Sequence, residues 1–578
     1  MISRRALALI GVMVILALSA GVRFWALGTP PGYIFDEVYY PHDAEALIDG
    51  QIGPKDGVLP WEPGKEISWP HPEYGKLAIA LGILAFGNNA FGWRFMSAVA
   101  GLLIICMVYP IARRLGLNRG WSLAALALAA TDTLGIAQSR IGTLDVFIAV
   151  FTVACIYLTL RYVQDGHRWY WLVLAGLAGG LAFGTKWSGA FACLVALVLV
   201  FLFRKRESDL VETHAAPPDQ AEVVGEKRSA LFSRAARARS ADAARRDMAT
   251  LAPAAVSGPQ VRTEAHAAPL ALRASFPRRA LHAARRAAPP LLLLVVLPIG
   301  LYVASYGFYF ASGHTWSQWV EMQRQALTFN LHLSQPHTYA SKSPTWILDI
   351  RPVWYYFQGK ITYHGIVAIG NPVLWWGAAL SLITLPIMAL VDRDRRLAMP
   401  ALLVALLYFP WFSATRTSFL YYMTPVAPFM AVMVAAALQR LTGQRQHWPR
   451  LRPSEEPLGD LRDQGRDYAA LVAFAAVFLV TAFFWQPIGH GVAYLFWRLP
   501  ERSSVPFAYI ITATALLLGA VGVAWVLARV RSVAVWRPLG WAYVGLAAGV
   551  CVAFLPIIID LGVSPAHYYQ LMWLPSWI

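Results

Sequence analysis

The sequence has little charge: Asp, Glu, Lys and Arg make up 14% of its 578 residues, whereas soluble domains carry about 25%. Cysteine is also scarce, and the four cysteines all fall inside apolar runs, so no disulfide framework is visible. No His and Cys spacing is typical of a zinc site. These absences exclude an ordinary soluble domain and a secreted disulfide scaffold, and they argue against a bound metal.

Apolar residues are abundant instead, with 57% hydrophobic residues and a mean hydropathy of +0.49. Apolar runs of about 20 residues recur, and each is long enough to cross a hydrocarbon core roughly 30 Å thick. We therefore predict an all-helical polytopic membrane protein with about 11–13 spans. The net charge of +17 does not indicate nucleic acid, because Lys and Arg cluster in alternate loops. That alternation is the orientation signal of a membrane protein.

Basic residues set the expected topology. Arg4 and Arg5 precede the first predicted span, residues 6–27, and place its start in the cytoplasm. No small-residue cleavage site follows this run, so we expect a retained helix and not a signal peptide. The same alternation predicts two large outer loops, at residues 28–76 and 312–363.

A polar insertion separates two membrane regions, 1–203 and 290–578. Residues 204–289 are rich in Ala, Arg and Pro, a composition that cannot bury a core, and we expect a disordered cytoplasmic segment. The apolar segment 77–89 is too short for a full span and suits an interfacial or re-entrant helix. The other predicted spans cover residues 93–112, 121–138, 143–162, 170–184, 188–203, 290–311, 366–390, 398–412, 420–438, 468–485, 506–528 and 538–559.

Unusual polar residues gather on one face under this topology. On the outer face, or within a turn of it, lie Asp36, Glu37, His71, Lys76, Arg94, Arg140, Asp145, Lys186, Asn371 and Arg416. Ionisable groups at membrane depth cost at least a few kcal/mol each and by default mark functional sites. Residues that merely snorkel to the interface should occur on both faces. We therefore predict that this set forms a site.

Structural roles stay open for individual members of the set. Asp36 and Glu37 could cap an interfacial helix, and Arg94 could be an interfacial anchor. Arg140 and Asp145 are a little over one helical turn apart and could pair with each other.

The chemistry that needs such a set is glycosyl transfer from a lipid phosphate. Cations at the membrane boundary would neutralise the leaving phosphate, arginine by bidentate hydrogen bonds. A carboxylate near the acceptor hydroxyl would remove its proton as the anomeric carbon is attacked. One base is enough for an inverting single displacement, because phosphate leaves with little help from a general acid. The second carboxylate of the Asp36 and Glu37 pair would then orient the site.

Stretches over nearly the whole chain match the pattern of one family. They are Phe35-Asp36-Glu37-Val38-Tyr39-Tyr40, His71-Pro72 with Gly75-Lys76, Phe91-Gly92-Trp93-Arg94, Arg140-Ile141-Gly142-Thr143-Leu144-Asp145, Gly184-Thr185-Lys186-Trp187-Ser188-Gly189, Gly370-Asn371-Pro372, Arg416 with Tyr421-Tyr422, and Trp573-Leu574-Pro575-Ser576-Trp577. In these stretches the sequence resembles the protein O-mannosyltransferases, in the form without an inserted soluble domain. One departure is Glu73, which stands where the family often has a second proline.

The resemblance implies a GT-C membrane fold, a polyprenyl-phosphate mannose donor, Ser/Thr acceptors on secreted polypeptides, inversion, and no metal or other cofactor. Asp36 would be the base, Glu37 its neighbour, and Arg94 would face the donor phosphate. Further candidates are Arg140, Lys186 and Arg416 for the phosphate, and His71, Lys76, Asp145, Asn371 and Tyr422 for the substrates.

The expected location is the cell (inner) membrane, with the active site on the extracytoplasmic face. Expected partners are the lipid donor, a secreted polypeptide acceptor, membrane lipid and the secretion translocon, and no nucleic acid. Two other functions compete with this prediction. A related transferase, such as an aminoarabinose transferase, would modify a lipid or glycan, but the terminal Trp-Leu-Pro-Ser-Trp favours a protein acceptor. A secondary transporter would place its ionisable groups near the midplane, whereas here they lie at one boundary.

Overall fold

The computed structural model describes residues 3–49, 70–214, 288–333, 335–414, 416–444 and 536–578. The chain divides into two compact units, Met1–Leu197 with Pro290–Ile578, and Val198–Pro289. The site below belongs to the first unit. Several predictions fall outside the described residues: the spans 468–485 and 506–528, residues 215–287 of the insertion, and residues 50–69 of the first outer loop.

Seven helices in the described part are long and apolar enough to cross a membrane. They are Arg5–Phe24, Ala90–Arg114, Asp145–Gln164, Ala288–Ser305, Pro372–Asp392, Arg395–Ser413 and Arg537–Ile557. Shorter apolar helices cover Tyr74–Phe86, Trp169–Phe183, Trp187–Phe203 and Ala427–Leu441. The predicted helical, multi-span membrane fold is therefore confirmed.

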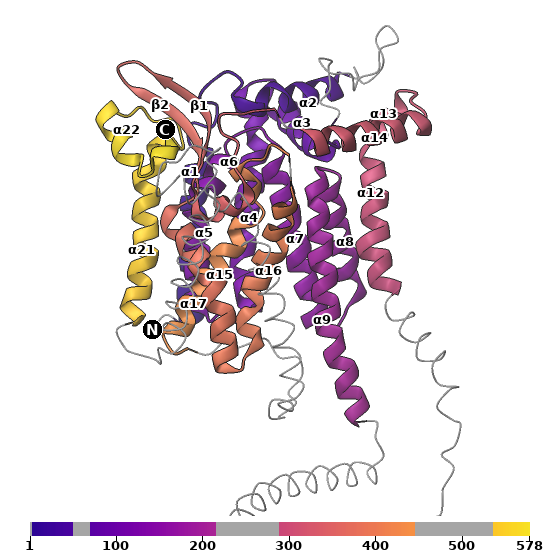
Figure 1. Cartoon of the computed structure of the whole chain (residues 1–578), viewed down its shortest axis with the longest axis vertical. Helices are drawn as coiled ribbons and strands as arrows, with labels where there is room; N and C mark the ends of the chain where they lie inside the picture. The colour runs from indigo at the N-terminus through magenta and orange to yellow at the C-terminus, as the bar shows by residue number, and fades with distance from the viewer. Residues whose placement is uncertain (1–2, 50–69, 215–287, 334, 415, 445–535) are drawn as a thin grey trace, which may run out of the picture. The chain divides into compact units, whose positions relative to one another are not determined.

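The helices pack into a bundle whose connecting loops carry the polar residues. Its elements are α1 (Arg4–Phe24), α2 (Tyr40–Ile48), α3 (Tyr74–Phe86), α4 (Ala90–Arg114), α5 (Arg119–Ala130), α6 (Thr133–Gln138), α7 (Asp145–Gln164), α8 (Trp169–Phe183), α9 (Ala190–His214), α12 (Leu297–Ser305), α13 (Gly307–Ala311), α14 (Trp316–His332), α15 (Pro372–Asp392), α16 (Met399–Tyr408), α17 (Ala427–Leu441), α21 (Trp536–Phe554) and α22 (Pro565–Leu571). Helix α4 packs against α1, α3, α5 and α7, and α17 packs against α5, α15 and α16. Figure 1 shows α2, α3 and the strands at one end of this bundle.

The predicted span 121–138 is wrong as a single helix, because it breaks at Asp132. The Asp132 carboxylate is the N-cap of α6 and accepts a hydrogen bond from the Gly135 backbone N–H at 3.0 Å. An N-cap residue has non-helical backbone angles, so it ends one helix and begins the next. The break places Gln138 at the end of α6 and Arg140 in the turn that leads to α7.

A small β-hairpin is the exception to the all-helical prediction. Strands β1 (Val353–Gly359) and β2 (Tyr363–Ala368) pair antiparallel. The predicted span 366–390 therefore starts too early, since its first residues belong to β2 and the helix begins only at Pro372. Asn371 caps that helix, and a proline at the first helical position fixes the start.

Helix α3 has 13 residues, as many as the short apolar segment predicted at 77–89, but it begins three residues earlier, at Tyr74, and ends at Phe86. Gly75 lets its start approach the turns before α7 and after α8. A Cβ added at Gly75 would lie 2.7 Å from Leu144 Cδ2 and 2.8 Å from Thr185 Cγ2, so a larger residue would push these segments apart. The close approach brings the His71 and Lys76 segment to the turns that carry Asp145 and Lys186.

Candidate active site

Asp36 lies in a short 3-10 turn, Phe35–Val38, just after α1. The preceding residue, Phe35, has a left-handed backbone with φ of 48°, a conformation uncommon for a bulky side chain. The Asp36 side chain is partly exposed. Burial raises the pKa of Asp36 to about 7; Lys186 opposes this shift and Asp145 adds to it. Asp36 is therefore a carboxyl group that changes charge near neutral pH.

Lys186 and Asp145 form a buried ion pair beside Asp36. The Lys186 Nζ atom lies 3.2 Å from Asp145 Oδ1 and 4.7 Å from the centre of the Tyr422 ring. A cation over an aromatic face is stabilised by the ring quadrupole. The structure therefore brings together four residues that the sequence places far apart: Asp36, Asp145, Lys186 and Tyr422.

His71 lies near three cations, Lys186, Lys76 and Arg416. Burial, followed by Lys186, Lys76 and Arg416, holds the pKa of His71 well below its usual range, so this imidazole is uncharged at neutral pH. Lys76 forms a buried ion pair with Asp43 at 3.2 Å, and the sequence analysis had not singled out Asp43.

Arg416, one of these three cations, is partly exposed. Its guanidinium donates to Asn330 Oδ1 and to the Thr417 carbonyl oxygen. Within the described residues, these bonds occupy two of its five N–H donors.

Glu37 and Arg94 form a second pair, completely buried. The Arg94 Nε and one NH2 hydrogen donate to the two Glu37 carboxylate oxygens, both at 2.7 Å. The other N–H groups donate to carbonyl oxygens after α1: Leu27 at 3.2 Å, Pro30 at 2.9 Å and Gly32 at 3.1 Å. A guanidinium has five N–H donors, and all five are used. In this arrangement Arg94 has no donor left for a phosphate.

The Glu37 carboxylate is equally occupied. Besides Arg94 it accepts from the Gly142 backbone N–H at 2.8 Å and the Ile34 N–H at 3.1 Å. Glu37 therefore joins the turn that carries Asp36 to α4 and to the segment before α7. This geometry fits the orienting role expected for the second carboxylate.

Arg140 and Asn371 hold backbone in place. Arg140 donates to carbonyl oxygens at the end of α1: Val22 at 2.9 Å, Arg23 at 3.1 Å and Trp25 at 2.7 Å. The last carbonyls of a helix lack intrahelical partners, and a cation there also complements the helix dipole. The suggested pairing of Arg140 with Asp145 is wrong, because Asp145 pairs with Lys186.

The Asn371 side chain is fully hydrogen-bonded. Its Oδ1 accepts from Val373 and Leu374 N–H, and its Nδ2 donates to Thr131 and Ala547 carbonyls at 3.0 and 2.8 Å. An amide side chain offers two donors and two lone pairs, so nothing remains for a substrate. The geometry thus argues against substrate contact by Asn371.

Three tyrosines that sequence reasoning missed surround Asp36: Tyr40, Tyr355 and Tyr421. Burial, together with nearby carboxylates that include Asp36, raises the pKa of each hydroxyl, which keeps them protonated. Tyr40 and Tyr421 stand in stretches that match the family pattern, whereas Tyr355 has no such signal. It reaches the site only because the hairpin folds back onto it.

The site can therefore do acid–base chemistry beside a bound anion. Asp36 is a carboxyl that ionises near pH 7, as a general base requires. Lys186 and Arg416 supply positive charge next to it, and the tyrosines supply neutral hydroxyl donors. Within the described ranges, no group of three His, Cys, Asp or Glu side chains could hold a metal ion.

Comparison with known proteins gives matches in both membrane regions. The family model for dolichyl-phosphate-mannose-protein mannosyltransferase matches residues 70–216, and that for the C-terminal four-span region of protein O-mannosyltransferase matches residues 315–496. The polyprenol-phosphate-mannose–protein mannosyltransferase of Mycolicibacterium smegmatis is 28% identical over 545 residues, covering 83% of this chain and 89% of that protein. The Corynebacterium glutamicum enzyme of the same name is 24% identical, covering 73% and 80%.

The fold points the same way. The structure of the S. cerevisiae Pmt1-Pmt2 protein O-mannosyltransferase complex, bound to its sugar donor, matches with a TM-score of 0.58 at 12% identity, over 100% of this chain and 93% of that one. This likeness concerns the fold, and the sequence matches concern the family. Together they confirm the predicted resemblance: the chain belongs to the protein O-mannosyltransferase family and has its GT-C membrane fold.

Proposed function

We propose that this protein transfers mannose from a polyprenyl-phosphate mannose to Ser or Thr hydroxyls of secreted or membrane polypeptides. The observation that carries the proposal is a partly exposed carboxyl, Asp36, that ionises near neutral pH beside the Lys186 cation. Two bacterial relatives bear the name polyprenol-phosphate-mannose–protein mannosyltransferase. Their donor and acceptor classes are the ones we assign to this chain.

The chemistry is an inverting single displacement. Asp36 takes the proton of the acceptor hydroxyl while the oxygen attacks the anomeric carbon of mannose. The bond from that carbon to the phosphate oxygen breaks, and the polyprenyl phosphate leaves with the bonding electrons. Lys186 and Arg416 stabilise the charge that develops on the phosphate, and the planar fork of arginine suits phosphate geometry.

The structure changes the roles that we propose for the other predicted site residues. Glu37 and Arg94 are positioning residues that hold the Asp36 turn, because neither has a hydrogen-bonding group to spare. Arg140 is a positioning residue as well, because it donates to carbonyl oxygens at the end of α1. His71 and Lys76 stay candidates for substrate contact, because His71 lies near Lys186, Arg416 and Lys76.

The acceptor class and the face of the membrane can be tested together. Right-side-out membrane vesicles that contain the protein are loaded with radiolabelled polyprenyl-phosphate mannose and given a Ser/Thr-rich peptide outside. We expect label in the peptide, and none with the Asp36→Asn variant. Label in a lipid or glycan other than the donor, with none in the peptide, would support a lipid or glycan acceptor. Transfer to peptide only after detergent permeabilisation would mean that the site faces the cytoplasm.

The pH dependence of turnover should follow the ionisation of the Asp36 carboxyl group. The ionised carboxylate is the active form of a base, and its pKa of about 7 lies above the ordinary value. Activity should therefore fall about tenfold for each unit below pH 7. Lys186→Met removes the cation that lowers this pKa and should shift the acid limb to higher pH. Arg324→Ala, at an exposed ion pair in α14, is the control and should not move it. An acid limb near pH 4 would contradict the assignment of the base.

A further inference from the structure

The end of the chain is bound to the segment that precedes the β-hairpin. The Trp577 indole N–H donates to the Asp349 carbonyl oxygen at 2.7 Å, and the Ser576 hydroxyl donates to the Ile350 carbonyl oxygen. Arg351 donates in turn to the Ser576 carbonyl oxygen at 2.9 Å. Residues 349–351 are thus all hydrogen-bonded to Ser576 or Trp577.

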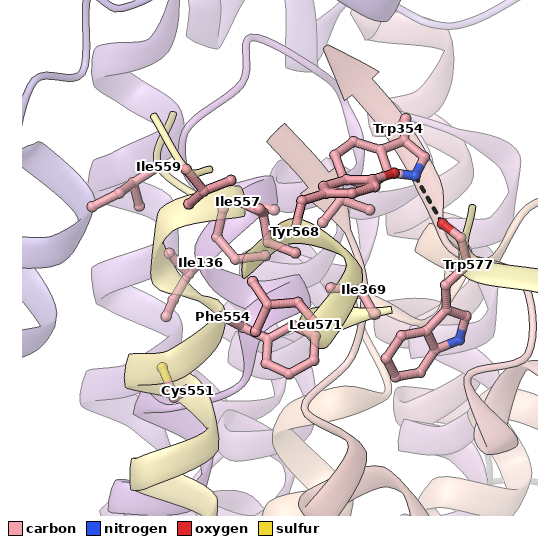
Figure 2. Packing of buried hydrophobic residues seen from close by; sticks show 14 of the residues in the cluster. Ile136, Trp354, Ile369, Cys551, Phe554, Ile557, Ile559, Tyr568, Leu571 and Trp577 are labelled. Atoms are coloured by element: carbon pink, nitrogen blue, oxygen red, sulfur yellow. Dashed lines mark hydrogen bonds between the residues drawn. The ribbon is translucent and has the colours of Figure 1, made fainter. Parts of the chain in front are cut away.

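The first strand of the hairpin is held by the same C-terminal residue. The Trp354 indole N–H donates to the Trp577 carbonyl oxygen at 3.0 Å, as Figure 2 shows. Both indoles are buried in one apolar cluster, with 7% and 1% of their surface exposed. Phe554 and Tyr568 belong to this cluster too. Trp354 is therefore held both by a hydrogen bond and by the burial of its ring against large aromatic side chains.

The next residue of the strand lines the proposed active site. The strand pairing is irregular between Trp354 and Tyr356, at Tyr355, and such bulges redirect a side chain, often beside active sites. Tyr355 packs against Phe35 with ring centres 4.7 Å apart. Its hydroxyl accepts a hydrogen bond from Gln138 Nε2 at 2.6 Å.

Trp354 and Tyr355 therefore couple the C-terminus to the catalytic turn. Trp354 belongs to the apolar cluster that contains Trp577, whereas Tyr355, redirected by the bulge, packs on Phe35. Phe35 is adjacent to Asp36 in sequence and has a left-handed backbone that needs support from its surroundings.

We propose that Ser576 and Trp577 are positioning residues that hold β1 in register, press Tyr355 against Phe35 and so fix the direction of the Asp36 carboxylate. This inference rests on the proposed function, because it assumes that Asp36 acts on a substrate. It gives the terminal Trp-Leu-Pro-Ser-Trp stretch a physical task that sequence comparison does not provide.

The test is a double-mutant cycle on mannose transfer by the full-length protein in membranes. Trp577→Phe keeps an aromatic ring but removes the indole N–H that binds Asp349, and Tyr355→Ala removes the contact with Phe35. Each should lower kcat about tenfold and leave KM for the lipid donor nearly unchanged, because small misplacements of a reacting group are costly. The double variant should be little worse than either single variant, since both act through the same contact.

Trp169→Phe is the matched control, because Trp169 is 71% exposed at the start of α8 and is not a member of the cluster around Trp577. It should leave kcat within about twofold. The coupling would be overturned if the two substitutions lowered kcat independently, so that their effects multiplied in the double variant. It would also be overturned if Trp577→Phe left kcat unchanged. If the unmodified protein itself transfers no mannose to peptide, the proposed function fails first, and that outcome is distinguishable from failure of the coupling.

Discussion

Replacing Asp36 with asparagine should lower the turnover of mannose transfer by about 10²–10⁴-fold, the usual contribution of a positioned base. Asparagine keeps the shape of the side chain but cannot accept the proton. Donor affinity should hardly change, because no cation beside the donor phosphate is removed. The measurement is the initial rate against polyprenyl-phosphate mannose concentration at matched protein levels.

Asp49→Asn is a suitable control for this variant, since Asp49 is exposed just beyond α2 in the same connecting segment. It should retain normal turnover. Near-normal turnover of Asp36→Asn would mean that the base is another residue. Glu37 would be a poor substitute, because its carboxylate is saturated by Arg94, Gly142 and Ile34. Asp145 would become the next candidate.

Replacing Arg94 with alanine should damage the fold more than it damages donor binding. The change leaves the Glu37 carboxylate buried without its cation, and breaking a buried ion pair in this way costs about 3–5 kcal/mol. We expect a lower unfolding temperature in detergent and less protein in the membrane. Arg94→Lys should recover only part of the loss, because lysine lacks the planar fork that binds both carboxylate oxygens.

The exposed pair of Arg324 and Glu321 provides the contrast. Arg324→Ala should leave the unfolding temperature unchanged, since exposed ion pairs contribute little. If Arg94→Ala raised KM for the lipid donor and left thermal stability normal, Arg94 would be a phosphate-binding residue, as the sequence predicts.

Much of the fold was predictable because a bilayer imposes simple rules on sequence. A span needs about 20 apolar residues, so α1, α4, α7 and α15 could be located within a few residues. The predicted helix boundaries that were wrong depend on single capping residues. Asp132 interrupts one apolar run by capping a new helix, and Asn371 with Pro372 delays another. These caps depend on tertiary neighbours such as Trp375, whose indole N–H donates to Asp132 at 2.8 Å.

The sequence by itself determined the helical membrane fold, because only long apolar segments can cross a bilayer, and it singled out ionisable residues that such a fold seldom carries. It could not determine their roles. Arg94 and Arg416 look alike as arginines in apolar surroundings, yet one is saturated by Glu37 and backbone carbonyls while the other keeps donors at the site. Only the tertiary structure decides how many hydrogen bonds a side chain has already made. It also brings Tyr355, from a hairpin more than 300 residues away in sequence, to the ring of Phe35. The sequence could not show this contact, because a contact across such a separation depends on packing and leaves no local pattern.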